Sequence, residues 1–174
     1  MRDVQRTFVI EAIMVAIYGE LLIPSEPVEF FIPYTTIEEL YEIRDSREII
    51  MPEAEDEAHV RLIIAELIAF FEEPFNKKKI ERSLAIPWAK SPPLPINEKV
   101  TFTVVNALED EEYGDAFDPI ETELILTAQL VQAPILSDDL DFVETLVQAE
   151  IPVQIYDMDD FEFAVEDGIP SADW

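Results

Sequence analysis

The chain has 174 residues, with 39 Asp and Glu against 11 Lys and Arg, a single histidine and a net charge of −28 at pH 7. Hydrophobic residues make up 49% of it and cysteine is absent, so the composition excludes disulfides, thiolate metal sites, a cysteine nucleophile and disorder caused by low hydrophobicity. It has three glycines and neither a GxxxxGK[ST] nor a GxGxxG pattern, which excludes a P-loop and a dinucleotide fingerprint. We expect a single domain over residues 1–174.

The residue pattern predicts strands and helices that alternate along the chain. Short runs of β-branched and aromatic residues are typical of strands, whereas apolar residues that recur every three or four positions are typical of helices. The expected strands cover residues 7–10, 28–33, 100–105, 134–136 and 152–156. The expected helices cover residues 11–22, 35–46, 53–73, 76–84, 118–132 and 139–150, and a threonine is the expected N-cap of the helix over 35–46.

Two segments lack so regular a pattern. Apart from the short helix and the strand named above, residues 74–117 are rich in proline and acidic residues, and we expect an irregular insert there. Residues 157–174 are an acidic tail, in which we expect Phe161, Phe163 and Trp174 to dock on the body of the domain.

Strands that alternate with helices predict an α/β fold. We expect three layers, α/β/α, around a short and mostly parallel sheet. In such sheets ligands bind beyond the carboxyl ends of the strands, so the residues that directly follow each strand are candidates for a functional site.

The charge is unevenly distributed along the chain. All 11 basic residues lie within residues 1–99 together with 19 acidic ones, whereas residues 100–174 hold 20 acidic residues and no base. Such a surface repels nucleic acid at low salt, and it suits solubility, a salty cytoplasm or a basic partner. No apolar stretch reaches the ~20 residues of a membrane span, and acids interrupt the first apolar run, so we expect a cytoplasmic protein without membrane contact.

Carboxylates follow several of the predicted strands. Glu11 comes directly after the first strand, and Glu39 lies near the start of the helix after the second. Glu121 opens a later helix, and Asp139 and Asp141 follow the short strand after it. Carboxylates crowded at one edge repel unless a cation binds or some stay protonated, and oxygen ligands of this kind suit Mg²⁺ or Mn²⁺. Glu11 carries the strongest signal because it lies between apolar runs, where an unpaired buried carboxylate is costly.

Each of the other acids also has a local explanation. The segment "DPIE" predicts a capping box that its aspartate opens as N-cap and Glu121 closes. Glu38 and Glu39 suit the positive end of a helix dipole, and "SDDLD", which begins at Ser137, suits a cap followed by first-turn acids. These local interpretations and a metal site remain alternatives at this point.

The segment "ETELILTAQLVQAPILSDDLDF", residues 121–142, resembles the PIN-domain family of metal-dependent ribonucleases. In that family an acid opens a helix that carries an alanine about two turns later. A short strand then leads to a Thr or Ser, any residue and an Asp, often with a second Asp two positions on. The matching residues here are Glu121, Ala128, Ser137, Asp139 and Asp141.

Two segments near the start of the chain extend this resemblance. "FVIEAI" resembles the first strand of the family and its acid, and "TTIEEL" resembles the helix that supplies the second acid, which falls on Glu39. The matches cover about residues 8–45 and 118–156. Glu11 and Glu121 stand where the family usually has aspartate.

The resemblance implies a PIN-like fold and a Mg²⁺- or Mn²⁺-dependent hydrolysis of RNA phosphodiester bonds. It implies catalytic and metal-binding roles for Glu11, Glu39, Glu121 and Asp139, with Asp141 in support and Ser137 orienting a ligand or a water. The alternative is a catalytically degenerate PIN-fold protein whose acidic surface binds a basic protein partner. An antitoxin partner and a homodimer are further expectations to test. The basic run of Lys77, Lys78, Lys79 and Arg82 suits either RNA phosphates or a solvated helix face.

Overall fold

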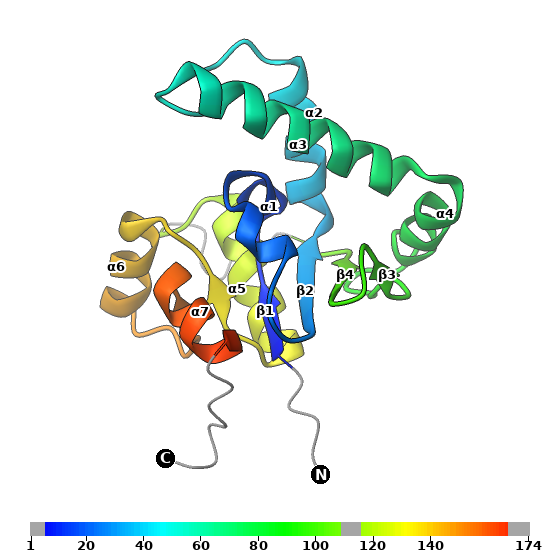
Figure 1. Ribbon diagram of the computed structural model, residues 1–174. Coiled ribbons are helices and arrows are strands. Elements are labelled where there is room, and N and C mark those ends of the chain that lie inside the picture. The colour runs from blue at the N-terminus through cyan, green and yellow to red at the C-terminus, as the bar shows by residue number, and fades with distance from the viewer. Residues whose placement is uncertain (1–5, 109–115, 167–174) are drawn as a thin grey trace.

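The computed structural model describes residues 6–108 and 116–166 of the chain (Figure 1). Its sheet has the strand order β3-β4-β2-β1-β5-β6, and all neighbouring strands are parallel except β3 and β4. The strands are β1 (Arg6–Val9), β2 (Val28–Pro33), β3 (Leu94–Pro95), β4 (Val100–Val105), β5 (Ile135–Leu136) and β6 (Ile155–Tyr156). The predicted α/β fold with a short, mostly parallel sheet is therefore confirmed.

The helices α1 to α6 follow the predicted order, and α7 is an additional one. They are α1 (Ala12–Ile17), the 3-10 helix η1 (Gly19–Leu22), α2 (Tyr34–Asp45), α3 (Ala54–Glu72), α4 (Pro74–Ser83), α5 (Pro119–Val131), α6 (Leu140–Gln148) and α7 (Met158–Glu166). Of those that the structure describes, none is both long enough and apolar enough to cross a membrane.

The sheet lies between two layers of helices. One apolar core joins one face of the sheet to α1, α2, α3, α4 and α7, and a second core joins the other face to α5 and α6. Because side chains along a strand alternate between faces, the neighbours Phe8 and Val9 of β1 belong to different cores. Figure 1 shows β1 and β2 near the centre, with α6 and α7 on one side of them and β3, β4 and α4 on the other.

Parallel pairing aligns a row of aromatic side chains across the sheet. Phe8 in β1 pairs with Phe30 in β2, and Phe30 pairs with Phe102 in β4. The ring centroids of these two pairs lie 6.3 and 6.2 Å apart. Phe30 and Phe102 are fully buried, so this row forms the centre of the larger core.

The first part of the acidic tail forms α7, a helix that the sequence pattern did not predict. Phe161 docks as expected, because its ring lies 5.1 Å from that of Phe8 and it is 3% exposed. The expectation for Phe163 is wrong, since this side chain is 51% exposed. Trp174 lies outside the described residues.

Two helix boundaries differ from the predicted ones. The helix expected over residues 11–22 ends at Ile17, because Tyr18 has non-helical backbone angles (φ −113°, ψ 84°) and η1 follows it. The helix expected to start with a threonine cap begins at Tyr34, directly after β2, and Pro33 at its N-cap position makes no side-chain cap. The hydroxyls of the next two threonines bond to other partners, which explains why neither serves as this cap.

In the segment 74–117 the predicted helix and strand are found as α4 and β4, and the part between them, expected to be irregular, contains the short strand β3. β4 pairs with β2 along its whole length, and its Val100, Phe102 and Val104 are fully buried. A strand of this segment is thus an internal strand of the sheet.

Candidate functional site

The order in which the chain adds strands to the sheet reverses at β1. From β1 it continues to β2 and then to β4 on one side, whereas β5 and β6 lie on the other side. The carboxyl ends of strands at such a reversal leave a crevice, and open α/β sheets bind ligands there. Glu11 follows β1 and residues 137–139 follow β5, so these two segments meet at the reversal.

A cavity of about 130 Å³ lies between these segments. Its polar side chains are Glu11, Ser137, Asp138 and Asp139, and its apolar ones include Met14, Leu124 and Leu136. The predicted meeting of Glu11 with Ser137 and Asp139 is therefore found. A larger cavity of about 350 Å³ lies at the opposite, amino ends of β5 and β6, and the described residues that line it include no acidic or basic one.

Glu11 is the most perturbed carboxyl of this cavity. Burial, as the largest cause, and repulsion from neighbouring carboxylates together raise its pKa to about 7. In order of decreasing influence, these neighbours are Glu39, Asp118, Asp139 and Asp138. All of the described groups that shift this pKa are acids, so Glu11 keeps its proton to a much higher pH than an ordinary glutamate does.

Glu39 and Glu121 belong to the same acidic environment. Burial raises the pKa of Glu39, and repulsion from Glu42 and Asp118 adds to it. Burial also raises the pKa of Glu121, and so does repulsion from Asp118 and Asp139, whereas a hydrogen bond from a backbone N–H opposes the rise. We call Glu11, Glu39, Asp118, Glu121, Asp138 and Asp139 the acid cluster.

Asp139 is also the N-cap of α6. Its Oδ1 accepts hydrogen bonds from the N–H groups of Asp141 and Phe142 at 3.1 and 3.3 Å. Its own N–H donates to Ser137 Oγ at 3.2 Å. The local interpretation of this segment, a cap followed by a first-turn acid, is confirmed, and the Ser137 hydroxyl fixes the backbone that carries Asp139 into the cavity.

The capping box predicted at the start of α5 is confirmed. The Asp118 N–H donates to Glu121 Oε1 at 3.0 Å, and the Glu121 N–H donates to Asp118 Oδ1 at 2.7 Å. The sequence marked Asp118 only as a cap, yet its carboxylate ranks second among the charges that act on Glu11. Asp118 is far from Glu11 along the chain, so no local sequence pattern indicates that it acts on the pKa of Glu11.

Replacing Asp118 by alanine is expected to lower the free energy of unfolding by about 1 kcal/mol, because α5 loses its N-cap. Urea unfolding at pH 5 measures this loss under conditions where Glu11 is largely protonated, so that relief of repulsion does not offset it. Asp118→Asn, which keeps a good cap, is the control. Equal stability of Asp118→Ala and Asp118→Asn would contradict the capping role.

Two further contacts were not predicted from the sequence. The Tyr18 hydroxyl donates a hydrogen bond to Asp138, and this bond is the largest of the causes that raise the pKa of the phenol to about 12. The Thr35 hydroxyl donates a hydrogen bond to the carboxylate of Glu123, which is 4% exposed in α5. No local pattern marks these residues, because their partners lie on other elements of the fold.

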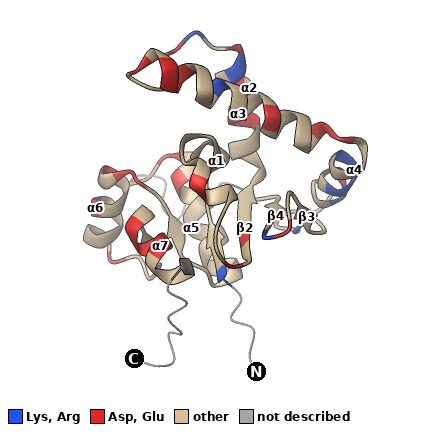
Figure 2. Ribbon diagram, viewed as in Figure 1, with Lys and Arg blue, Asp and Glu red and all other residues tan. Residues whose placement is uncertain are grey.

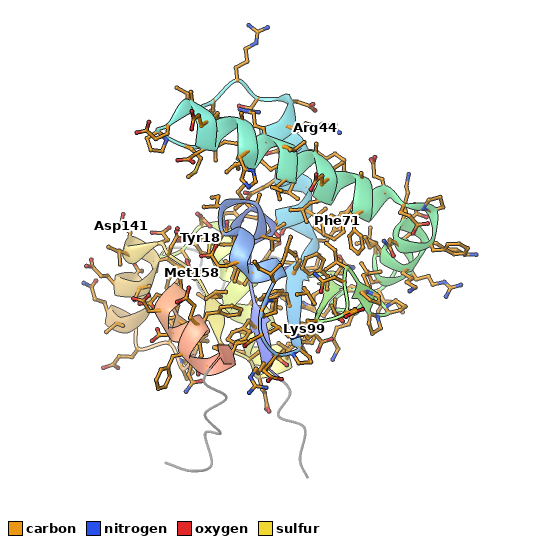
Figure 3. All side chains as sticks on the ribbon, viewed as in Figure 1. Tyr18, Arg44, Phe71, Lys99, Asp141 and Met158 are labelled. Atoms are coloured by element: carbon orange, nitrogen blue, oxygen red, sulfur yellow. The ribbon has the colours of Figure 1, made fainter. Side chains whose placement is uncertain are left out.

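Other predicted site residues lie elsewhere. Asp141 is exposed on the outer start of α6 (Figure 3) and is not among the acids that shift the pKa of Glu11. The basic run lies on α4, at the side of the molecule away from α1 and α6 (Figure 2). Of its members, Lys79 donates to the Pro93 carbonyl at 3.4 Å. Lys77, Lys78 and Arg82 are exposed.

The interpretation of Glu38 and Glu39 as dipole partners is wrong. Because α2 begins at Tyr34, both residues lie in its second turn, and the first turn contains no acid. The stabilising effect of a helix dipole falls off within the first turn. Among the charges that raise the pKa of Glu11, that of Glu39 has the largest influence, although Glu39 is not among the described residues that line the cavity.

The acid cluster suits a hard divalent cation in its chemistry and its place. Its ligand atoms are carboxylate oxygens, which Mg²⁺ and Mn²⁺ prefer. The ion pairs Arg44–Asp45 and Arg61–Glu57 include none of its members. Within residues 6–108 and 116–166, however, no three His, Asp or Glu side chains are arranged to hold one ion. A cation would thus have to draw several of these carboxylates toward it.

No protein-family model and no curated protein matches this chain. Its function is therefore inferred from the residues and their geometry.

Proposed function

We propose that this protein is a PIN-like ribonuclease that depends on Mg²⁺ or Mn²⁺ and hydrolyses RNA phosphodiester bonds in the cytoplasm. The observation that carries the proposal is the partly buried Glu11, whose pKa burial and four surrounding carboxylates raise to about 7. It lies at the carboxyl ends of β1 and β5, where an α/β sheet binds its ligand. Helix caps account for Asp118, Glu121 and Asp139, but Glu11 makes no side-chain cap of its helix, so capping does not explain this buried acid.

Glu11, Glu39, Glu121 and Asp139 would hold the ion in this function. When bound, a divalent cation supplies activation of water and stabilisation of charge on a phosphodiester. The chain itself contributes a cavity with apolar walls at Met14, Leu124 and Leu136, which limits the access of bulk water. Ser137 holds the backbone of Asp139, and because the pKa of Glu11 without a cation is about 7, binding of the ion would release the proton of this carboxyl.

A second candidate is a PIN-like protein without catalytic activity that binds a basic protein, such as an antitoxin. One observation favours it: Asp139, Asp118 and Glu121 already accept hydrogen bonds from backbone N–H groups, which leaves fewer free oxygens for a metal. The basic residues of α4 also lie away from the cavity (Figure 2), so they offer no cationic path for RNA beside the acids.

RNA cleavage by the purified protein separates these two candidates. With Mn²⁺ present, the wild type is expected to cut single-stranded RNA, and Glu11→Gln to reduce the rate roughly 10- to 100-fold, as loss of a group that supports a metal typically does. Glu66→Gln is the matched control, because Glu66 is exposed on α3. Activity that Glu11→Gln leaves intact, or that EDTA does not remove, would count against the ribonuclease.

A further inference from the structure

The N-terminus of α1 is capped from another helix. The Ala12 N–H donates to Thr36 Oγ1 in α2 at 3.1 Å, and the Thr36 hydroxyl donates to the Pro33 carbonyl at 2.9 Å. Thr36 is 2% exposed, so this pair of hydrogen bonds is shielded from water. One hydroxyl therefore links the residue after Glu11 to the end of β2.

This arrangement leaves the side chain of Glu11 out of its own helix cap. Glu11 occupies the N-cap position of α1, and an N-cap side chain normally accepts a hydrogen bond from the second or third N–H of the helix. Here Glu11 makes no side-chain cap, and the third N–H, that of Met14, donates to the Glu11 backbone carbonyl at 3.0 Å. The bond from Ala12 to Thr36 thus holds the start of α1 without a side-chain cap from Glu11, whose carboxylate lines the cavity instead.

The same threonine also relates Glu11 to the second acid. Thr36 and Glu39 are three residues apart on α2 and hence lie on the same face of that helix. Glu39 has the largest electrostatic influence on Glu11. The hydrogen bond between α1 and α2 thus joins the two helix starts that carry these acids.

We propose that Thr36 is a positioning residue that keeps the Glu11 side chain in the cavity. The Mg²⁺ or Mn²⁺ ligand of Glu11 rests on the proposed function, whereas the position of the Glu11 side chain and its dependence on Thr36 do not. Loss of the hydroxyl would remove the bond that ties the backbone beside Glu11 to α2 and to the end of β2. Without this tie, the backbone that carries the Glu11 carboxylate can shift away from the cavity.

The test compares Thr36→Val, which keeps the shape but removes the hydroxyl, with Thr36→Ser, which keeps the hydroxyl. In Thr36→Val we expect nuclear Overhauser contacts between the Glu11 side chain and Leu136 to be lost and Mn²⁺ affinity in calorimetry to fall at least tenfold. Thr36→Ser should restore both. Thr101→Val in β4 makes the same chemical change near the amino end of the sheet and should alter neither.

The two readouts distinguish the failure of this proposal from the failure of the ribonuclease. If Thr36→Val is folded by thermal melting and keeps the contacts of Glu11, or if Thr36→Ser fails to restore them, the positioning role is overturned whatever the metal data show. If the wild type binds no Mn²⁺ while the contacts change as expected, Thr36 retains its role and the metal-dependent function is overturned.

Discussion

Glu11→Gln is expected to stabilise the protein by about 2 to 3 kcal/mol at pH 8, but by no more than about 1 kcal/mol at pH 5. Burial and the repulsion of Glu39, Asp118, Asp139 and Asp138 raise the pKa of Glu11 from 4.5 to about 7 in the folded protein. Between these values the folded state holds a proton that the unfolded state has released. Stability contributed by this group is therefore complete below pH 4.5 and is lost as the pH rises through about 7.

Glutamine removes the charge while preserving the shape, so the variant avoids this loss. Urea unfolding of the wild type and the variant at both pH values measures the difference. The other acids titrate in both proteins, so their contributions cancel in this comparison. Glu66→Gln, at an exposed position, measures how much the loss of one negative charge changes the free energy of unfolding. A Glu11→Gln variant no more stable than Glu66→Gln at pH 8 would show that Glu11 is not confined among like charges.

Phe161→Ala is expected to lower the free energy of unfolding by about 3 to 5 kcal/mol, the usual cost of removing a buried phenylalanine. Its ring packs 5.1 Å from Phe8 and 6.1 Å from Phe30, and so closes the aromatic row at the centre of the larger core. The truncated side chain would leave a space that the rigid sheet cannot fill.

Phe163→Ala provides a matched control on the same helix. Phe163 is 51% exposed, so its truncation should change the stability by no more than about 0.5 kcal/mol. Denaturant unfolding of both variants measures the contrast. Similar stabilities of the two would mean that α7 does not dock on the sheet through Phe161.

Much of the fold could be predicted from local sequence patterns. The strands over residues 28–33 and 100–105 were predicted to the residue, because β-branched and aromatic side chains fill both faces of an internal parallel strand. The break after α1 was not predicted, since apolar residues continue through Tyr18 and the bond of its hydroxyl to Asp138 is a tertiary contact. The helix α7 was missed because its acidic composition resembled a tail, and only Phe161 indicated docking.

The candidate site was predicted only in part, for a related reason. Sequence position after a strand identified Glu11 and Asp139, and the order of the strands brought them together. Asp118 was missed as a member of the cluster because its capping role explained it locally. Thr36 was missed because its importance depends on a hydrogen bond to another helix. Local patterns thus find residues at strand ends, whereas the partners of those residues follow from packing.

The most direct test of the proposed metal site is a calorimetric titration of Mn²⁺ into the wild type and Asp139→Asn, at low and at molar salt. Asparagine still caps α6, so the variant should stay folded, and Asp56→Asn on the exposed start of α3 controls for general charge loss. We predict a saturable site of micromolar affinity that persists in molar salt, is kept in Asp56→Asn and is lost in Asp139→Asn. Weak binding that is the same in all three proteins and vanishes in molar salt would contradict a metal site in the acid cluster.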